Sequence, residues 1–137
     1  MRLQAGDSFL GGLPGHTKHL WFVLTRPNDD GKVVIANVTS SQCYRDENCV
    51  IEPGDHPFVR KRSIILYDNA MLSLIDRLDE AVERGEVQQR EPASGDLYRR
   101  IVEGGLESDD TVGKIRTELE RGSMSTLEYE GLRKSHR

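Results

Sequence analysis

The sequence predicts a mainly β protein of the α+β class, in which a small β-barrel comes first and helices follow it. Short segments rich in β-forming residues, separated by Gly, Pro, Asn and Asp, fill roughly the first half of the chain. In the second half, apolar residues recur instead at helical spacing. With 137 residues, 36% of them hydrophobic, and a net charge of -4, the chain fits one domain with a modest core.

Four or five strands are expected in the first part of the chain. They are an apolar segment that ends at Leu10, followed by residues 19–25, 32–39, 49–52 and 59–67. Residues 28–31, with the sequence Asn-Asp-Asp-Gly, tolerate the backbone conformations of a tight turn and predict a hairpin between the second and third of these strands. Closing such short strands into a barrel is the most economical arrangement, because it removes exposed sheet edges.

Three helices are expected after the strands. The first is capped by Ser73 and ends at Gly85, the second is capped by Ser94 and ends near Gly104, and the third covers residues 109–121. From Gly122 onward the chain is charged and has almost no apolar pattern. We therefore expect a barrel over residues 1–72, a helical extension packed on it over 73–121, and a tail over 122–137 that is flexible or ordered by a partner.

Composition excludes several classes of function. No stretch approaches the roughly 20 apolar residues of a membrane span, and no secretory signal is apparent, so a cytoplasmic location is expected. Cys43 and Cys49 suit neither a disulfide framework nor zinc-finger spacing, so we expect reduced thiols, no metal and no cofactor. The net acidity argues against broad nonspecific binding to DNA.

Two segments carry the functional signal. The strand at residues 33–38 ends in the hydroxyl groups of Thr39, Ser40 and Ser41, and residues 54–63 deliver a histidine and three successive cations. Hydroxyl groups and cations along one rim of a small sheet are typical of a site for phosphate or RNA.

The order of these elements resembles the PemK/MazF (Kid-like) family of toxin-antitoxin ribonucleases over roughly residues 6–76. The resemblance rests on the Gly6-Asp7 opening, the apolar strand at 19–24, the strand at 33–40 that ends in Thr-Ser, and the strand at 63–66. It implies an SH3-like barrel with attached helices, usually a homodimer, that cleaves single-stranded mRNA without a metal. It also implies a cognate antitoxin protein as partner.

The resemblance extends to single residues. The family opens its second strand with an arginine and a proline, and the arginine polarises the scissile phosphate; His19 and Leu20 stand at those positions here. The hydroxyl residue that ends the next strand is retained as Thr39, with Ser40 beside it. The loop before the second strand is shortened to residues 15–18, and residues 54–58 are not part of the family pattern.

Cleavage of RNA without a metal requires a base, an acid and fixed cations that stabilise the charge developing on the phosphate. Histidine titrates near neutrality and serves either proton-transfer role, arginine clamps phosphate, and a hydroxyl group orients an oxygen. The candidate catalytic residues are His19, Thr39, His56 and Arg60. The candidate substrate-binding residues are His16, Thr17, Lys18, Ser40 and Arg62.

Each candidate also has a structural interpretation. His56, in the sequence Asp-His-Pro, is suited to holding a turn in which Asp55 accepts a backbone hydrogen bond. The cations at 60–62 suit the solvated face of an edge strand. His19 suits a satisfied polar position flanking Trp21, and residues 39–41 suit an ordinary strand end. Two functions therefore stay open: a toxin-like endoribonuclease, and a non-catalytic barrel that binds a protein or a nucleic acid.

Overall fold

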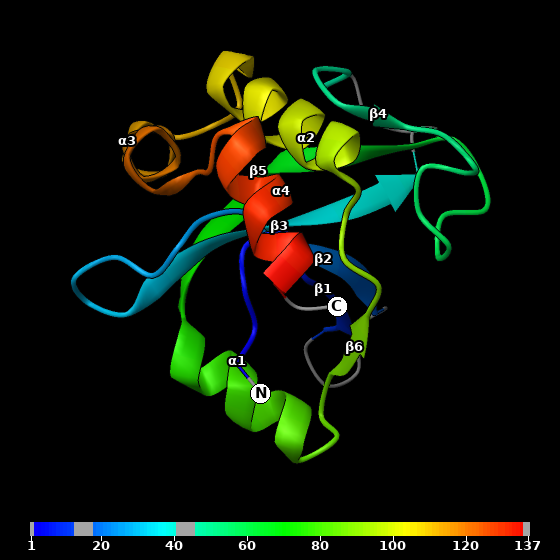
Figure 1. Cartoon of the computed structure of the whole chain (residues 1–137). Helices are drawn as coiled ribbons and strands as arrows, with labels where there is room; N and C mark the ends of the chain where they lie inside the picture. The colour runs from blue at the N-terminus through cyan, green and yellow to red at the C-terminus, as the bar shows by residue number, and fades with distance from the viewer. Residues whose placement is uncertain (1, 13–17, 41–45, 136–137) are drawn as a thin grey trace.

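The computed structural model describes residues 2–12, 18–40 and 46–135, which form a six-stranded antiparallel sheet and four helices (Figure 1). The strands are β1 (Ser8–Gly11), β2 (His19–Val23), β3 (Lys32–Ser40), β4 (Val50–Ile51), β5 (Ser63–Leu74) and β6 (Gln88–Arg90). The helices are α1 (Ile75–Glu83), α2 (Gly95–Glu107), α3 (Gly113–Gly122) and α4 (Thr126–Ser135). The α+β class and the barrel-like sheet with following helices are confirmed.

The sheet is curled into a half-barrel with the strand order β4-β5-β3-β2-β1-β6. Between Ile35 and Asn37 the register of β3 with β5 shifts, so that Ile35 lies opposite Met71 and Asn37 lies opposite Leu66. The extra residues in β5 bend it, as bulges do. Among the described residues no pairing joins β4 to β6, so these two edge strands form the two ends of the curled sheet.

His56 connects these two ends. It lies in the loop that follows β4, and its Nε2 is 2.7 Å from the carbonyl oxygen of Glu91, just after β6, and 3.3 Å from Oγ of Ser8 on β1. Its Nδ1 accepts the backbone N–H of Phe58 at 3.1 Å, so the ring hydrogen is on Nε2 and is donated to Glu91. The ring is 2% exposed and meets Phe22 edge-to-face at 5.4 Å. One buried imidazole thus ties the loop after β4 to the opposite end of the sheet.

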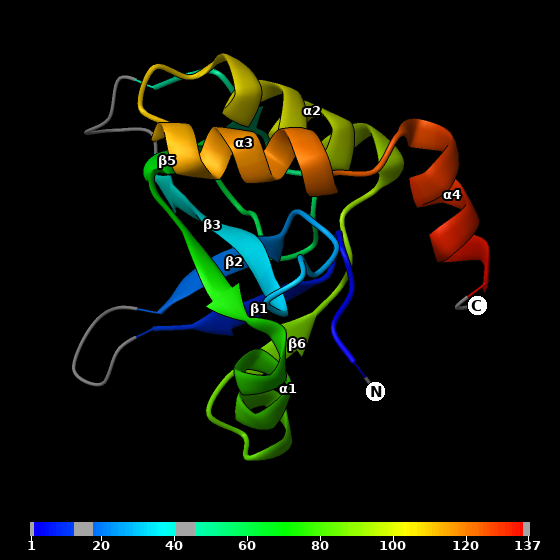
Figure 2. The ribbon, with the colours of Figure 1, turned by 90° about the vertical axis from the view of Figure 1, so that its left-hand side faces the viewer.

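Helices cover both faces of the sheet (Figures 1 and 2). The concave face packs against α2, α3 and α4 in the larger core, and α1 covers the other face with a smaller core around Phe9 and Ile35. Three buried tyrosine hydroxyls each donate to a backbone carbonyl at 2.6 Å: Tyr67 to Ile101, Tyr98 to Leu24 and Tyr129 to Ala93. These bonds let large amphipathic rings fill the core without an unsatisfied polar group.

Local signals predicted several element ends correctly. The turn at 28–31 is present, with Gly31 at φ +73° and the Asn28 side chain accepting the backbone N–H of Lys32 at 2.9 Å. Ser94 caps α2 by accepting the N–H of Leu97 at 3.1 Å, and Gly85, at φ +75°, follows α1.

Other predicted ends were wrong. Ser73 does not cap α1, because β5 continues through Leu74 and α1 begins without a side-chain cap. The strand expected at 59–67 begins only at Ser63, because the preceding residues form the loop around His56. Helix α2 does not end at Gly104: a Cβ there would lie 2.6 Å from the Tyr67 hydroxyl, so glycine allows the helix to pack closely rather than ending it.

Two segments differ more widely from expectation. Residues 88–90, expected within a helical extension, form β6 and pair with β1. The tail expected to be flexible or ordered by a partner forms α4, in which Tyr129 is 1% exposed and stacks on Tyr98 at 4.2 Å between ring centroids. Arg133 of α4 also pairs with Asp7 at 2.9 Å. These contacts join residues far apart in sequence, which is why no local pattern indicated them.

None of the helices among the described residues combines the length and the apolar character that crossing a membrane requires.

The packing of α4 predicts that Tyr129→Ala lowers the free energy of unfolding by about 3–5 kcal/mol, because it removes a buried aromatic ring and leaves a cavity. Leu127→Ala is the matched control, since Leu127 lies on the same helix and is 81% exposed; its cost should stay below about 0.5 kcal/mol. Urea denaturation measures both values. Equal, small effects would show that α4 is not part of the folded unit.

Burial raises the pKa of the Cys49 thiol to about 11, whereas an unfolded chain releases this proton near about 8.5. The raised pKa means that its contribution to stability is complete below about pH 8.5 and is lost as the pH rises toward 11. Denaturation between those values should show a steeper loss of stability in the wild type than in Cys49→Ala. Parallel pH profiles would contradict this, since tyrosine ionisation is common to both proteins.

Candidate functional site

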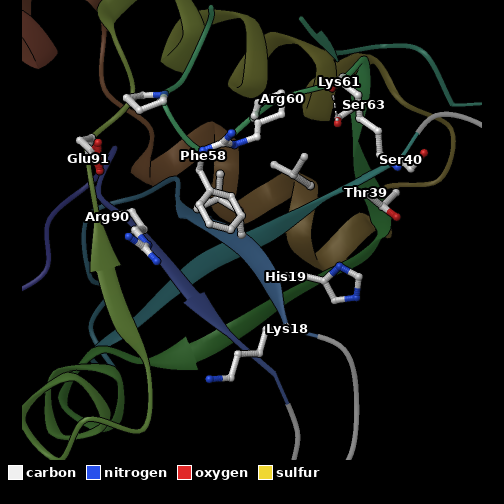
Figure 3. A pocket seen from close by; sticks show the side chains of 14 residues that line it. Lys18, His19, Thr39, Ser40, Phe58, Arg60, Lys61, Ser63, Arg90 and Glu91 are labelled. Carbon is white, nitrogen blue, oxygen red and sulfur yellow. Dashed lines mark hydrogen bonds between the residues drawn. The ribbon is translucent and has the colours of Figure 1, made fainter. Parts of the chain in front are cut away.

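A cavity of about 760 Å³ opens where the loop after β4 faces the ends of β2 and β3 (Figure 3). One wall comes from Lys18, just before β2, from His19 at the start of β2, and from Thr39 and Ser40 at the end of β3. Four of the candidate residues expected from sequence therefore share this wall.

The facing wall comes from residues 57–61 and from the end of β6. It carries Phe58, Arg60 and Lys61 from the loop, and Arg90 and Glu91 from β6 and the residue after it. Figure 3 shows Phe58, Arg60 and Arg90 on one side of the cavity and His19 with Thr39 on the other. Segments that lie some 70 residues apart in the chain, His19 and Arg90, thus meet in one site.

Strand register places His19 beside Thr39. Trp21 lies opposite Asn37 in the antiparallel pair of β2 and β3, and continuing this register by two residues brings His19 opposite Thr39. Side chains of opposed residues share a face of the sheet, and Figure 3 shows His19 and Thr39 on the same side of the view. The ends of β2 and β3 therefore bring an imidazole and a hydroxyl group to the same cavity.

The charge of the cavity is opposite in sign to that of the whole chain. Its lining contains four cations, Lys18, Arg60, Lys61 and Arg90, and one carboxylate, Glu91. Within the described residues none of the four cations forms an ion pair. A lining in which cations outnumber carboxylates attracts anions, so the charge of the cavity suits an anionic ligand although the chain carries -4.

Among the described residues, two buried polar atoms of the lining have no hydrogen-bond partner: Oγ of Ser40 and Nε of Arg90. Buried polar atoms in folded proteins are nearly always hydrogen-bonded, and a bound water, ion or ligand is one explanation of an exception. Arg90 does use another nitrogen, since its Nη2 donates to Oε1 of Gln88 at 3.0 Å. The cavity thus combines cationic groups with hydrogen-bonding capacity that the fold does not consume.

The loop wall is fixed from behind. Arg100 of α2 donates to the carbonyl of Val50 at 2.9 Å and pairs with Asp55 at 3.2 Å. Asp55 in turn accepts the backbone N–H of Glu52 at 2.8 Å, as the sequence predicted for this turn. Together with the bonds of His56, these contacts hold the backbone on both sides of the turn and so fix the wall without occupying the cavity.

The remaining candidate residues lie elsewhere. His56 is behind the wall, not in the lining, and both ring nitrogens are engaged, which supports its structural interpretation. Arg62 lies outside the lining and pairs with Glu47 at 2.7 Å and Glu52 at 3.3 Å. His16 and Thr17 lie outside the described residues.

Sequence reasoning missed Arg90 as a member of the site. Its strand, Gln-Gln-Arg, has no apolar alternation and is held by pairing with β1, so it carried no strand signal. Phe58 and Lys61 belong to the 54–63 segment but are not among the candidate residues that the sequence predicts. In the described part of the chain no group of three or more His, Cys, Asp or Glu side chains is arranged to hold a metal ion.

Comparisons with models of known protein families, with curated proteins and with solved structures find no match for this chain.

Proposed function

We propose that this chain is a toxin-like endoribonuclease that cleaves single-stranded RNA without a metal, and that the cavity is its active site. The single observation that carries the proposal is that one cavity gathers four cations, none of which forms an ion pair within the described residues, together with the imidazole of His19 and the hydroxyl group of Thr39. A phosphodiester supplies the negative charge that these cations lack, and the 2′-hydroxyl of RNA supplies the proton that an imidazole removes.

The proposed reaction uses residues from both walls. His19 accepts the proton of the 2′-hydroxyl, the 2′-oxygen bonds to phosphorus, and the bond from phosphorus to the 5′-oxygen breaks. The leaving oxygen takes up a proton from water, and the resulting hydroxide takes the proton from His19, which leaves a 2′,3′-cyclic phosphate, a 5′-hydroxyl end and a neutral imidazole. Arg60 stabilises the charge that gathers on the phosphate oxygens, and the Thr39 hydroxyl orients one of them.

The resemblance to PemK/MazF toxins adds two further proposals. They are a cognate antitoxin protein that neutralises the enzyme and a homodimer as the working form. A cytoplasmic location, where mRNA is available, is proposed from the composition of the chain.

The alternative is a non-catalytic barrel that binds a nucleic acid or a protein through the same cavity. One observation favours it: His19 stands where the family has the arginine that polarises the phosphate. The two functions differ in whether bound RNA is cut.

The proposal predicts cleavage of a labelled single-stranded RNA in the presence of EDTA, with cyclic phosphate ends detected by mass spectrometry. His19→Ala should slow cleavage roughly 100- to 10,000-fold, the usual contribution of a general base. Arg60→Ala should weaken binding and reduce its salt dependence. Arg77→Ala is the matched control. Arg77 is exposed on α1, outside the cavity, and its substitution removes the same positive charge as Arg60→Ala does.

Replacing the 2′-hydroxyl groups by 2′-O-methyl groups should abolish cleavage and leave binding intact. Arg60-dependent binding of RNA that is never cut would support the non-catalytic barrel instead. A protein that neither cuts nor binds RNA, or a His19→Ala variant that cuts at the wild-type rate, would contradict the proposed active site.

A further inference from the structure

Phe58 is an unusual side chain for a cavity built of cations and hydroxyl groups. Of the four large hydrophobic side chains that are exposed among the described residues, it is the aromatic one and the one that lines the cavity. It is 40% exposed, although burying a phenylalanine side chain is worth roughly 1.5–3 kcal/mol. The fold thus leaves an aromatic surface open inside an anion-binding site.

The backbone that carries this ring is held in place. The N–H of Phe58 donates to Nδ1 of His56, and the N–H of Val59 donates to the carbonyl of His56 at 3.0 Å. The guanidinium of Arg90 lies 5.2 Å from the ring centroid, within the range of a cation–π contact. A ring fixed in this way loses little freedom when a ligand binds, so its exposure is preorganised.

Phe58 and Arg90 together indicate the chemistry of the ligand. A purely apolar partner would bury Arg60, Lys61 and Lys18 without supplying counter-charge, which is costly. A nucleotide supplies both a flat aromatic face for the ring and an anionic phosphate for the cations. The unpartnered Nε of Arg90 is a further donor, suited to the edge of a base or to a phosphate oxygen.

We propose that Phe58, backed by Arg90, is the platform on which one unpaired nucleobase stacks beside the phosphate that is cut. This inference rests on the proposed function and specifies its substrate, because a base within a duplex has both faces covered and cannot reach the ring. RNA in the cavity therefore enters as a single strand with one base on Phe58, toward the β6 side, and the reacting phosphate toward His19.

The test measures the affinity of the protein for a short 2′-O-methyl RNA that cannot be cut, by fluorescence anisotropy. Phe58→Leu keeps an apolar side chain but removes the aromatic face, and it should weaken binding roughly 5- to 150-fold, the range measured for loss of one base stack. Phe58→Trp should bind at least as tightly as the wild type. Leu127→Ala removes an exposed apolar side chain outside the cavity and should leave the affinity unchanged.

A scan of single abasic sites through the same RNA locates the stacked base. At one position the abasic RNA should bind wild type and Phe58→Leu equally, because each change removes the same contact. Thermal unfolding of each variant checks that the fold is retained. Suppose that binding depends on Arg60 but not on Phe58, and that Phe58→Leu has the same effect at every abasic position. The stacking proposal is then wrong, while the proposed function stands. If no RNA binds, the proposed function fails, and the platform fails with it.

Discussion

The hydrogen bonds of His56 are the constraint on which the rest of the structure depends. The half-barrel has two free ends, and the loop after β4 is tied to the residue after β6 through Nε2 of this one ring. Nδ1 of the same ring accepts the N–H of Phe58. The His56 side chain therefore both links the two ends of the sheet and holds one wall of the cavity in place. A neutral imidazole suits this place because it offers one donor and one acceptor in opposite directions.

The cations of the cavity differ from several other cations of the chain. Arginines such as Arg99, which pairs with Asp96 at 2.8 Å, have carboxylate partners, whereas the cations of the cavity form no ion pair among the described residues. An anionic ligand that enters the cavity therefore breaks no ion pair among these residues. An acidic chain can therefore carry a cationic cavity of the kind that the proposed RNA substrate needs, and the exposed ring of Phe58 adds an aromatic surface to it.

The distance along the chain between interacting residues explains which elements the sequence predicted and which it did not. The turn at 28–31 and the Ser94 cap depend on hydrogen bonds within a few residues, so their residue types predicted them. Strand β6 and helix α4 depend on β1, Asp7 and Tyr98, which are distant in the chain, and no periodicity revealed them. In the site, strand ends and turn residues predicted His19, Thr39 and Arg60. From the sequence alone, His56 and His19 are equally suited to proton transfer. The structure distinguishes them, because both ring nitrogens of His56 are engaged in hydrogen bonds.

Amide hydrogen exchange at Phe58 and Val59, measured by NMR in His56→Ala and in His19→Ala, tests most directly whether His56 holds the cavity wall. We expect both amides to exchange at least about tenfold faster in His56→Ala, because the acceptor of Phe58 and the tie to Glu91 are lost, while amides of the β2–β3 hairpin keep their protection. His19→Ala should leave Phe58 and Val59 unchanged. Unaltered protection of these two amides in His56→Ala would contradict the account.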